Sequence, residues 1–87
     1  MRHGKGVLYH NNKKIYDGEF KNGKYDGNGI LYFENDYYYV GEFKNDLMEG
    51  DGIVYDKNGK ENYKGKFSNN EPKDSYFVYI FKKIFKK

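Results

Sequence analysis

One five-residue pattern recurs three times in this chain: an aromatic residue, any residue, glycine, any residue and phenylalanine. Its copies are YDGEF, YVGEF and YKGKF, which begin at Tyr16, Tyr39 and Tyr63. Tyr16 to Tyr39 is a step of 23 residues, and Tyr39 to Tyr63 is a step of 24. A fixed period above about 20 residues is the signature of a repeat architecture, in which one supersecondary unit stacks on the next. The chain is therefore built from copies of one unit.

A second phrase, Gly-x-Gly followed by two aliphatic residues and tyrosine, keeps the same period. Three copies are intact: GKGVLY from Gly4, GNGILY from Gly27 and GDGIVY from Gly50. A fourth copy, from Asp74 to Tyr79, reads DSYFVY and has lost both glycines. The unit keeps a constant length, whereas the connection between units varies by one residue. This pattern indicates that the unit folds as a piece and that the connection is a surface loop.

Each unit reads as a β-hairpin. The aromatic residues of YDGEF alternate with charged ones, which is typical of a half-buried strand. The second phrase supplies a strand of aliphatic and aromatic residues. The predicted structural core repeats one set of positions: Tyr16, Gly18, Phe20, Tyr39, Gly41, Phe43, Tyr63, Gly65 and Phe67. Glycine normally weakens a strand, so its recurrence predicts that a neighbouring Tyr or Phe ring lies over the bare backbone.

Turn residues separate the two strands of each unit. The first unit has the turn dipeptide Asn22-Gly23, and the later units carry Asp46 and Asn70 at the position of Gly23. Asp and Asn tolerate a left-handed backbone, so the turn survives the loss of glycine.

The charged positions of the aromatic motif predict a row on the solvent side of the sheet. Stacking of the hairpins places Glu19, Glu42 and Lys66 in that row. Opposite charges in neighbouring positions stabilise a sheet, and we expect Glu42 and Lys66 to pair.

Composition limits the chain to one small domain. It has 87 residues, with eleven Tyr and seven Phe that supply the apolar area for a core. The net charge of +3 comes from the last six residues, because removing the lysines at 82, 83, 86 and 87 leaves 12 basic against 13 acidic residues. A nucleic-acid-binding protein normally spreads basic residues over a folded face. This composition argues against nucleic acid as a partner.

The two phrases together resemble the MORN repeat, the membrane occupation and recognition nexus. The resemblance runs from Gly4 to about Tyr79, with Phe where the family often has Trp. It divides an array over residues 1–81 into a half-repeat 4–15, repeats 16–38 and 39–62, and a degenerate repeat 63–81, followed by a basic tail 82–87. The resemblance implies an all-β fold, an elongated antiparallel sheet of stacked hairpins that forms a solenoid, closed by a short C-terminal helix or a strand cap.

The resemblance implies a non-enzymatic scaffold or adaptor for protein–protein assembly in the cytoplasm, near a membrane or the cytoskeleton. Two alternatives stay open: a peripheral module that binds anionic lipid or phosphoinositide, and a regulatory segment of a larger enzyme. A homo-oligomer stays open as well. The residues give no catalytic, cofactor or metal site, because Cys is absent and no glycine phrase continues into the Lys-Ser/Thr of a phosphate loop. The carboxylates Asp46, Glu49 and Asp51 read as a solvated turn.

The second strands are apolar on both faces. One row is the candidate partner groove, formed by Leu8, Leu31, Val54 and Val78. The opposite row contains Val7, Ile30, Ile53 and Phe77, each two residues before a tyrosine. A single-layer sheet leaves one row exposed as a binding surface, whereas a curved sheet buries both rows against its own loops. The sequence does not decide which row is exposed.

The C-terminal segment carries two overlapping patterns. Phe77 and Tyr79 continue the alternation of a strand, yet apolar residues from Phe77 onward also fall at helical spacing among lysines. The candidate lipid or partner tail comprises Phe81, Lys82, Lys83, Ile84, Phe85, Lys86 and Lys87. A basic amphipathic helix suits a membrane surface or a partner. The alternatives are a cap on the open end of the solenoid and self-association.

Overall fold

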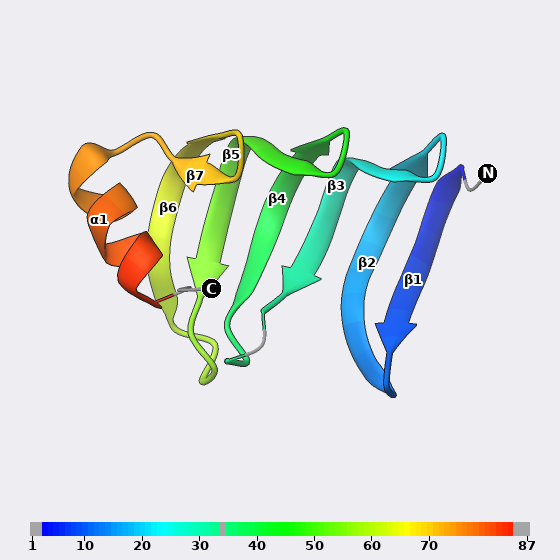
Figure 1. The fold of residues 1–87 in the computed structure, drawn as a ribbon, viewed down its shortest axis with the longest axis horizontal. Coiled ribbons are helices and arrows are strands. Elements are labelled where there is room, and N and C mark those ends of the chain that lie inside the picture. The colour runs from blue at the N-terminus through cyan, green and yellow to red at the C-terminus, as the bar shows by residue number, and fades with distance from the viewer. Residues whose placement is uncertain (1–2, 34, 85–87) are drawn as a thin grey trace.

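A computed structural model describes residues 3–33 and 35–84 of the chain. They form one antiparallel sheet in which every strand pairs with the next strand along the sequence, followed by a helix (Figure 1). The elements are β1 (Gly4–His10), β2 (Lys13–Lys21), β3 (Lys24–Tyr32), β4 (Tyr38–Lys44), β5 (Leu47–Tyr55), β6 (Glu61–Ser68), β7 (Glu71–Pro72) and α1 (Ser75–Ile84). The predicted all-β stack of hairpins is confirmed, and the longest dimension is 37 Å.

A row of glycines crosses the sheet at right angles to the strands. Cross-strand pairing joins, in order, Gly6, Gly18, Gly29, Gly41, Gly52 and Gly65. A side chain added at Gly41 would lie 2.6 Å from the Cα of Gly52 and 2.7 Å from the hydroxyl oxygen of Tyr39. Real Cβ atoms do not approach other atoms this closely, so only glycine fits. We call the face on which these side chains are missing the inner face of the sheet. The glycine row forms a shallow channel along it.

The motif tyrosines lie in this channel. Tyr16 and Tyr39 are fully buried, and their hydroxyls donate hydrogen bonds to the backbone carbonyls of Glu19 (2.7 Å) and Glu42 (2.8 Å). Each ring covers the glycine of its own strand and the glycine of the next strand. Tyr63 repeats the arrangement with a longer bond of 3.3 Å. The prediction of a ring over the strand glycine is confirmed, and the ring belongs to the tyrosine two residues earlier.

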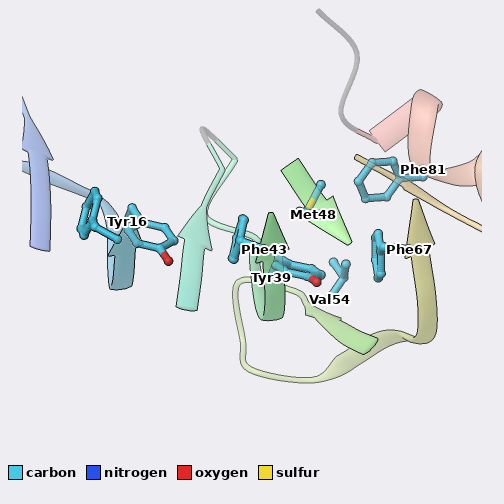
Figure 2. Packing of buried hydrophobic residues seen from close by; sticks show 8 residues of the cluster. Tyr16, Tyr39, Phe43, Met48, Val54, Phe67 and Phe81 are labelled. Atoms are coloured by element: carbon cyan, nitrogen blue, oxygen red, sulfur yellow. The ribbon is translucent and has the colours of Figure 1, made fainter. Parts of the chain in front are cut away.

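The phenylalanines of the motif connect one repeat to the next. The ring of Tyr39 contacts Phe43 edge-on at 5.1 Å between centroids, and it contacts Phe67 of the next repeat at 4.8 Å. Tyr16 contacts Phe43 in the same way at 5.2 Å. Edge-to-face pairs of this kind are favourable beyond the area they bury. The result is one continuous line of rings through the inner face (Figure 2).

The hairpin turns are joined to each other by hydrogen bonds that the sequence did not indicate. Asp46 and Asn70 have the expected positive φ, 73° and 70°, close to the 79° of Gly23. In addition, Asp46 exchanges two hydrogen bonds with the backbone of Tyr25, at 2.8 and 3.0 Å. Asn70 does the same with Met48, at 2.8 and 3.2 Å. These residues therefore replace glycine because their side chains tie each turn to the preceding hairpin.

The degenerate fourth phrase forms helix α1, so the alternative of a strand cap is wrong. Its second lost glycine is replaced by Tyr76, at the position where Gly29 and Gly52 lie beneath a tyrosine ring. A tyrosine there would collide with the ring of Tyr63. Pro72 ends β7, and Asp74 caps the helix by accepting hydrogen bonds from the N–H groups of Tyr76 (3.0 Å) and Phe77 (3.2 Å). The helix then packs over the end of the inner face.

Replacing Gly41 with valine tests the glycine row. We expect Gly41→Val to lower the free energy of unfolding by about 2 kcal/mol or more, because the new side chain meets the backbone of β5 as well as the Tyr39 hydroxyl. Chemical denaturation measures the change. The control is Lys44→Val, an exposed position on the same strand, with an expected effect within about 0.5 kcal/mol. Equal stability of the two variants would contradict the steric role of the row.

The buried hydroxyls predict a loss of stability in alkali. Burial, reinforced by the charge of Glu19, raises the pKa of Tyr16 from 10.0 to about 12. Burial and Glu42 likewise raise the pKa of Tyr39. The neutral phenol is the folded form, so this stability is complete below pH 10 and falls as the pH rises from 10 towards 12. The free energy of unfolding, measured at successive pH values across this range, should fall less steeply for Tyr39→Phe than for the parent. If the free energy of unfolding depended on pH in the same way in both proteins, the loss of stability could not be assigned to the buried Tyr39 hydroxyl.

Candidate binding surface

The outer face of the sheet carries a continuous group of apolar and aromatic side chains. Because successive residues of a strand point to opposite faces, the neighbours of buried Tyr39 and Val54 point outward. Cross-strand pairing joins Ile30 to Val40 and Val40 to Ile53 in one row, and Tyr32 to Tyr38 and Tyr38 to Tyr55 in the next. We define the outer patch as Ile30, Tyr32, Tyr38, Val40, Ile53 and Tyr55. All six are half-buried.

The tyrosines of the outer patch contact one another across three strands. The rings of Tyr38 and Tyr55 are nearly parallel, 23° apart, with centroids separated by 5.1 Å. Tyr32 lies 6.0 Å from Tyr38 on the other side, and the Lys14 ammonium is 5.9 Å from the centre of the Tyr32 ring. Rings held by neighbours on both sides lose little conformational freedom on binding. This part of the patch is a preformed aromatic surface.

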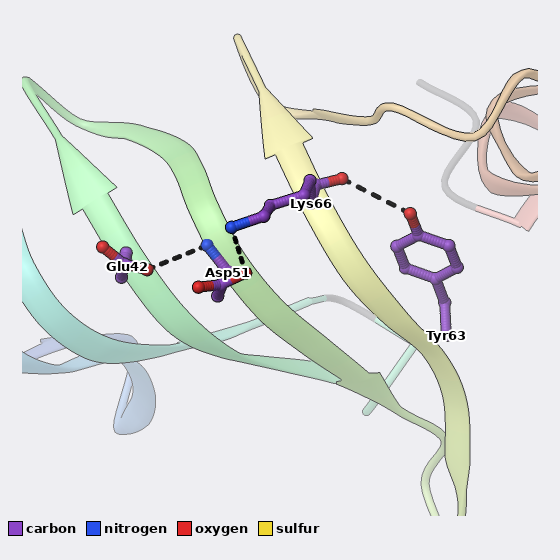
Figure 3. Close-up of polar contacts among 4 residues, drawn as sticks. All are labelled: Glu42, Asp51, Tyr63 and Lys66. Carbon is purple, nitrogen blue, oxygen red and sulfur yellow. Dashed lines mark hydrogen bonds and ion pairs between the residues drawn. The ribbon is translucent and has the colours of Figure 1, made fainter.

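Charged residues border the outer patch and hold the backbone. The carboxylate of Glu42 accepts a hydrogen bond from the N–H of Asp51 at 2.9 Å. The Lys66 ammonium lies 2.7 Å from the Asp51 carboxylate (Figure 3), and this hydrogen bond raises the pKa of Lys66. The expected pairing of Glu42 with Lys66 is therefore wrong, because the side chain of Asp51 on β5 lies between them. The border is polar and of mixed sign.

A shallow hollow of about 330 Å³ lies next to the patch. Ile30 and Val40 form its apolar side, with Lys5, Asp17 and Glu19 among its charged walls. The hollow is wide enough for one protruding side chain of a partner, but it holds no nucleophile paired with a base. A second hollow of about 400 Å³, beside Leu8 and Tyr25 on the inner face, lacks such a pair too. Neither hollow has the arrangement of a catalytic site.

Metal binding receives no support from the carboxylates of the turns. In the part of the chain that the structure describes, no three His, Cys, Asp or Glu side chains gather as a metal site. Asp46 accepts the N–H of Tyr25 at 2.8 Å, and Glu49 accepts the N–H of Asn69 at 2.8 Å. These carboxylates therefore hold the backbone of the turns.

The predicted partner groove is wrong, because its four residues do not form one exposed row. Leu31 and Val54 pair with the motif tyrosines, so they share the inner face; Val54 is buried and Leu31 packs against the core. Val78 belongs to helix α1 and cannot continue a strand row. Only Leu8 remains exposed, on the edge strand β1. The opposite row lies on the outer face, except for Phe77, which belongs to helix α1 and packs against Tyr63. On the outer face the row gains Val40, which occupies the position of the charged residues Asp17 and Lys64 in the other motifs.

Helix α1 places the residues of the predicted tail in different surroundings. Phe81 is buried against Phe67, with ring centroids 6.2 Å apart, so it is not free to enter a lipid surface. Lys82 forms an ion pair with Glu71 at 3.3 Å, and the Lys83 ammonium lies 5.1 Å from the centre of the Tyr79 ring. Ile84 ends the helix. Phe85, Lys86 and Lys87 lie outside the described residues, and lipid binding by the tail stays a prediction.

Comparison with known proteins places this arrangement in a family. A family model of the MORN repeat matches residues 1–14, 16–36 and 39–61, which together make up more than half of the chain. A search of curated proteins found no match. Five of the six outer-patch residues lie in the matched stretches, and Tyr38 falls between two of them. Among the described residues, no helix has the length and apolar character needed to cross a membrane.

Two adjacent tyrosines test the division between the faces. We expect Tyr38→Ser to lower the free energy of unfolding by about 0.5–2 kcal/mol, because it removes the cross-strand aromatic pairs with Tyr32 and Tyr55. Tyr39→Ser should cost about 3–5 kcal/mol, because it empties a buried site. Denaturant titrations of both variants give the comparison. If Tyr38→Ser were as damaging as Tyr39→Ser, the outer patch would be part of the core.

Proposed function

This chain belongs to the MORN-repeat family, and from that premise we propose that it is a scaffold that binds a protein partner across the outer patch. The MORN repeat is a non-catalytic repeat module, and neither hollow described above offers catalytic chemistry. The proposal includes a cytoplasmic setting near a membrane or the cytoskeleton, as the family resemblance suggests.

The observation that carries the proposal is the unequal use of the two apolar faces. The inner face builds the core from Tyr16, Tyr39, Phe43 and Phe67, and helix α1 packs over its end. The outer patch contributes six half-buried aliphatic and aromatic side chains on the face opposite to the one that helix α1 packs against. A contiguous apolar surface with a polar border is typical of a protein-interaction site.

The position of the outer patch in the sheet favours binding with little rearrangement. Its residues lie on β3, β4 and β5, which are central strands paired on both sides. The residues that alternate with them, such as Tyr39 and Val54, are fixed in the core. A rigid surface of this kind keeps the entropy lost on binding small. Tyrosine is also among the residues that contribute most to binding energy at interfaces.

Charge substitutions in the patch provide the test. Val40→Lys and Ile53→Lys place an ammonium group within the apolar row and leave the inner face unchanged. The tagged chain and its variants are used to capture proteins from cell extract, with quantitative mass spectrometry as the readout. We expect specific partners to be reduced by about tenfold or more with either variant.

The control is Lys24→Glu, an exposed substitution at the first hairpin turn, which should retain the partners. Thermal melting of all variants confirms that each is folded. A set of captured proteins that does not differ between Val40→Lys and Lys24→Glu would contradict binding through the outer patch.

A further inference from the structure

Two strands flank the outer patch and carry reversed charges at equivalent positions. β2 lies next to β3 on one side of the patch, and β6 lies next to β5 on the other. Both strands hold the aromatic motif, so Tyr16 of β2 is equivalent to Tyr63 of β6. Three charged residues of β2 point to the outer face, and each has an equivalent of opposite charge in β6: Lys14 and Glu61, Asp17 and Lys64, Glu19 and Lys66.

The central row of the outer patch ends in one of these reversed pairs. Ile30, Val40 and Ile53 form the apolar part of this row. Asp17 pairs with Ile30 at one end, and Lys64 pairs with Ile53 at the other. The row therefore has its midpoint at Val40 on β4, with an acidic end on β2 and a basic end on β6.

The tyrosine row has the opposite polarity. Tyr32, Tyr38 and Tyr55 form its aromatic part. The Lys14 ammonium lies 5.9 Å from the centre of the Tyr32 ring, and Glu61 pairs with Tyr55. This row is basic on β2 and acidic on β6, and its midpoint, Tyr38, again lies on β4.

A third row borders the patch and has the polarity of the central row. Glu19 accepts the N–H of Asn28 at 3.1 Å, and Glu42 accepts the N–H of Asp51 at 2.9 Å. Asp51 pairs with Lys66, and the side chains of this ion pair are 69% and 64% exposed. The Lys66 ammonium is therefore accessible to a second carboxylate. The midpoint of this row is Glu42 on β4.

This arrangement is self-complementary about an axis that runs along β4 in the plane between two facing sheets. A twofold rotation about that axis places β2 of one copy against β6 of a second copy, and β3 against β5. Ile30 then meets Ile53 of the second copy, and Val40 meets its own equivalent. A twofold dimer uses the same surface on both subunits, so each contact away from the axis occurs twice. Reversed charges on the two flanks are what this symmetry requires.

We propose that the partner at the outer patch is a second copy of this chain, in a twofold dimer of face-to-face sheets with β4 at the axis. The inference rests on the proposed function and names the occupant of the same surface. In the dimer, Asp17 faces Lys64 of the second copy, and the other two reversed pairs meet in the same way. Aligned sheets pack about 10 Å apart, with their strands within about 30° of each other. The apolar rows form the centre of the interface, and the opposite charges fix its register.

The hollow next to the patch supports this register. Asp17 and Glu19 contribute to its walls, beside Ile30 and Val40. The axis brings Lys64 of the second copy over this hollow, and the Lys64 side chain is exposed. A lysine packs its apolar stem against such a surface while its ammonium group contacts carboxylates. An apolar hollow with acidic walls thus meets a side chain of matching chemistry.

Sedimentation equilibrium of the full 87-residue chain over a range of concentrations is the first test. We expect the mass to rise from that of one chain to that of two. Val40→Lys brings two ammonium groups together at the axis and should weaken the dimer by about tenfold or more, whereas Lys24→Glu at the first hairpin turn should not. Thermal melting verifies that each variant is folded. A monomer at every concentration, or an equally tight Val40→Lys dimer, overturns the proposal.

Charge reversal tests the twofold arrangement itself. Asp17→Lys and Lys64→Asp each create two like-charged contacts and should each weaken the dimer by about tenfold. In an equimolar mixture, a dimer with one chain of each kind has opposite charges at both contacts. We expect this mixed dimer, detected by energy transfer between labelled chains, to bind within about threefold of the parent. If mixing does not restore the dimer, the twofold register is overturned.

Glu42 lies on the axis and tests the register in the opposite direction. Two Glu42 carboxylates approach each other in the dimer, and like charges across an interface weaken it. Glu42→Gln keeps an oxygen that accepts the N–H of Asp51 and removes this repulsion. The variant should dimerise about twofold to fivefold more tightly. A dimer weakened by this substitution would contradict an axis along β4.

Capture from extract separates this inference from the proposed function. A monomeric chain whose captured proteins are lost with Val40→Lys would overturn the second copy as the occupant and leave the outer patch as a site for another protein. A dimer that Val40→Lys dissociates, with the captured proteins unchanged, would support the second copy and exclude another partner at the patch. The dimer shields Val40 and Ile53 from a soluble probe, so their accessibility in the single chain is measured below the dissociation constant or on Asp17→Lys.

Discussion

The seating of each motif tyrosine in the glycine row is the interaction on which the rest of this structure depends. The ring fits because its own strand and the next strand both have glycine beneath it. Its hydroxyl donates a hydrogen bond to the backbone carbonyl three residues further along the same strand. A buried phenol without such a partner would be unfavourable. With it, a sheet of one layer obtains a core of close-packed rings. The glycines therefore serve packing, and the chain tolerates their weak strand propensity for that reason.

This packing also determines which surface is free. Once Tyr16, Tyr39 and Val54 occupy the inner face, the alternation of a strand directs Tyr38, Val40 and Ile53 outward. The core is completed at one end by helix α1 and not by another hairpin. The same rule explains the C-terminal end of the sheet, because a tyrosine in place of glycine at position 76 stops the repeat.

The sequence predicted the fold through its period, its turn residues and its alternation, all of which are local properties. It did not predict the exposed face, because both rows of the second strands are apolar and the choice depends on which row shares a face with Tyr16 and Tyr39. Val40 was the available signal, since it stands where the other motifs have Asp17 and Lys64. The links between Asp46 and Tyr25, and between Asp51 and Lys66, depend on side-chain reach between strands, which spacing alone does not give.

The division between a closed inner face and an open outer face is most directly tested by methyl NMR with a soluble paramagnetic probe. Ile53 and Val54 are adjacent in β5 and provide an internal comparison. The structure predicts strong signal loss for the methyl groups of Ile53 and Val40, and protection of the methyl groups of Val54, which is 1% exposed. Equal attenuation of Ile53 and Val54, or protection of Ile53 alone, would contradict the account of the core and of the outer patch together.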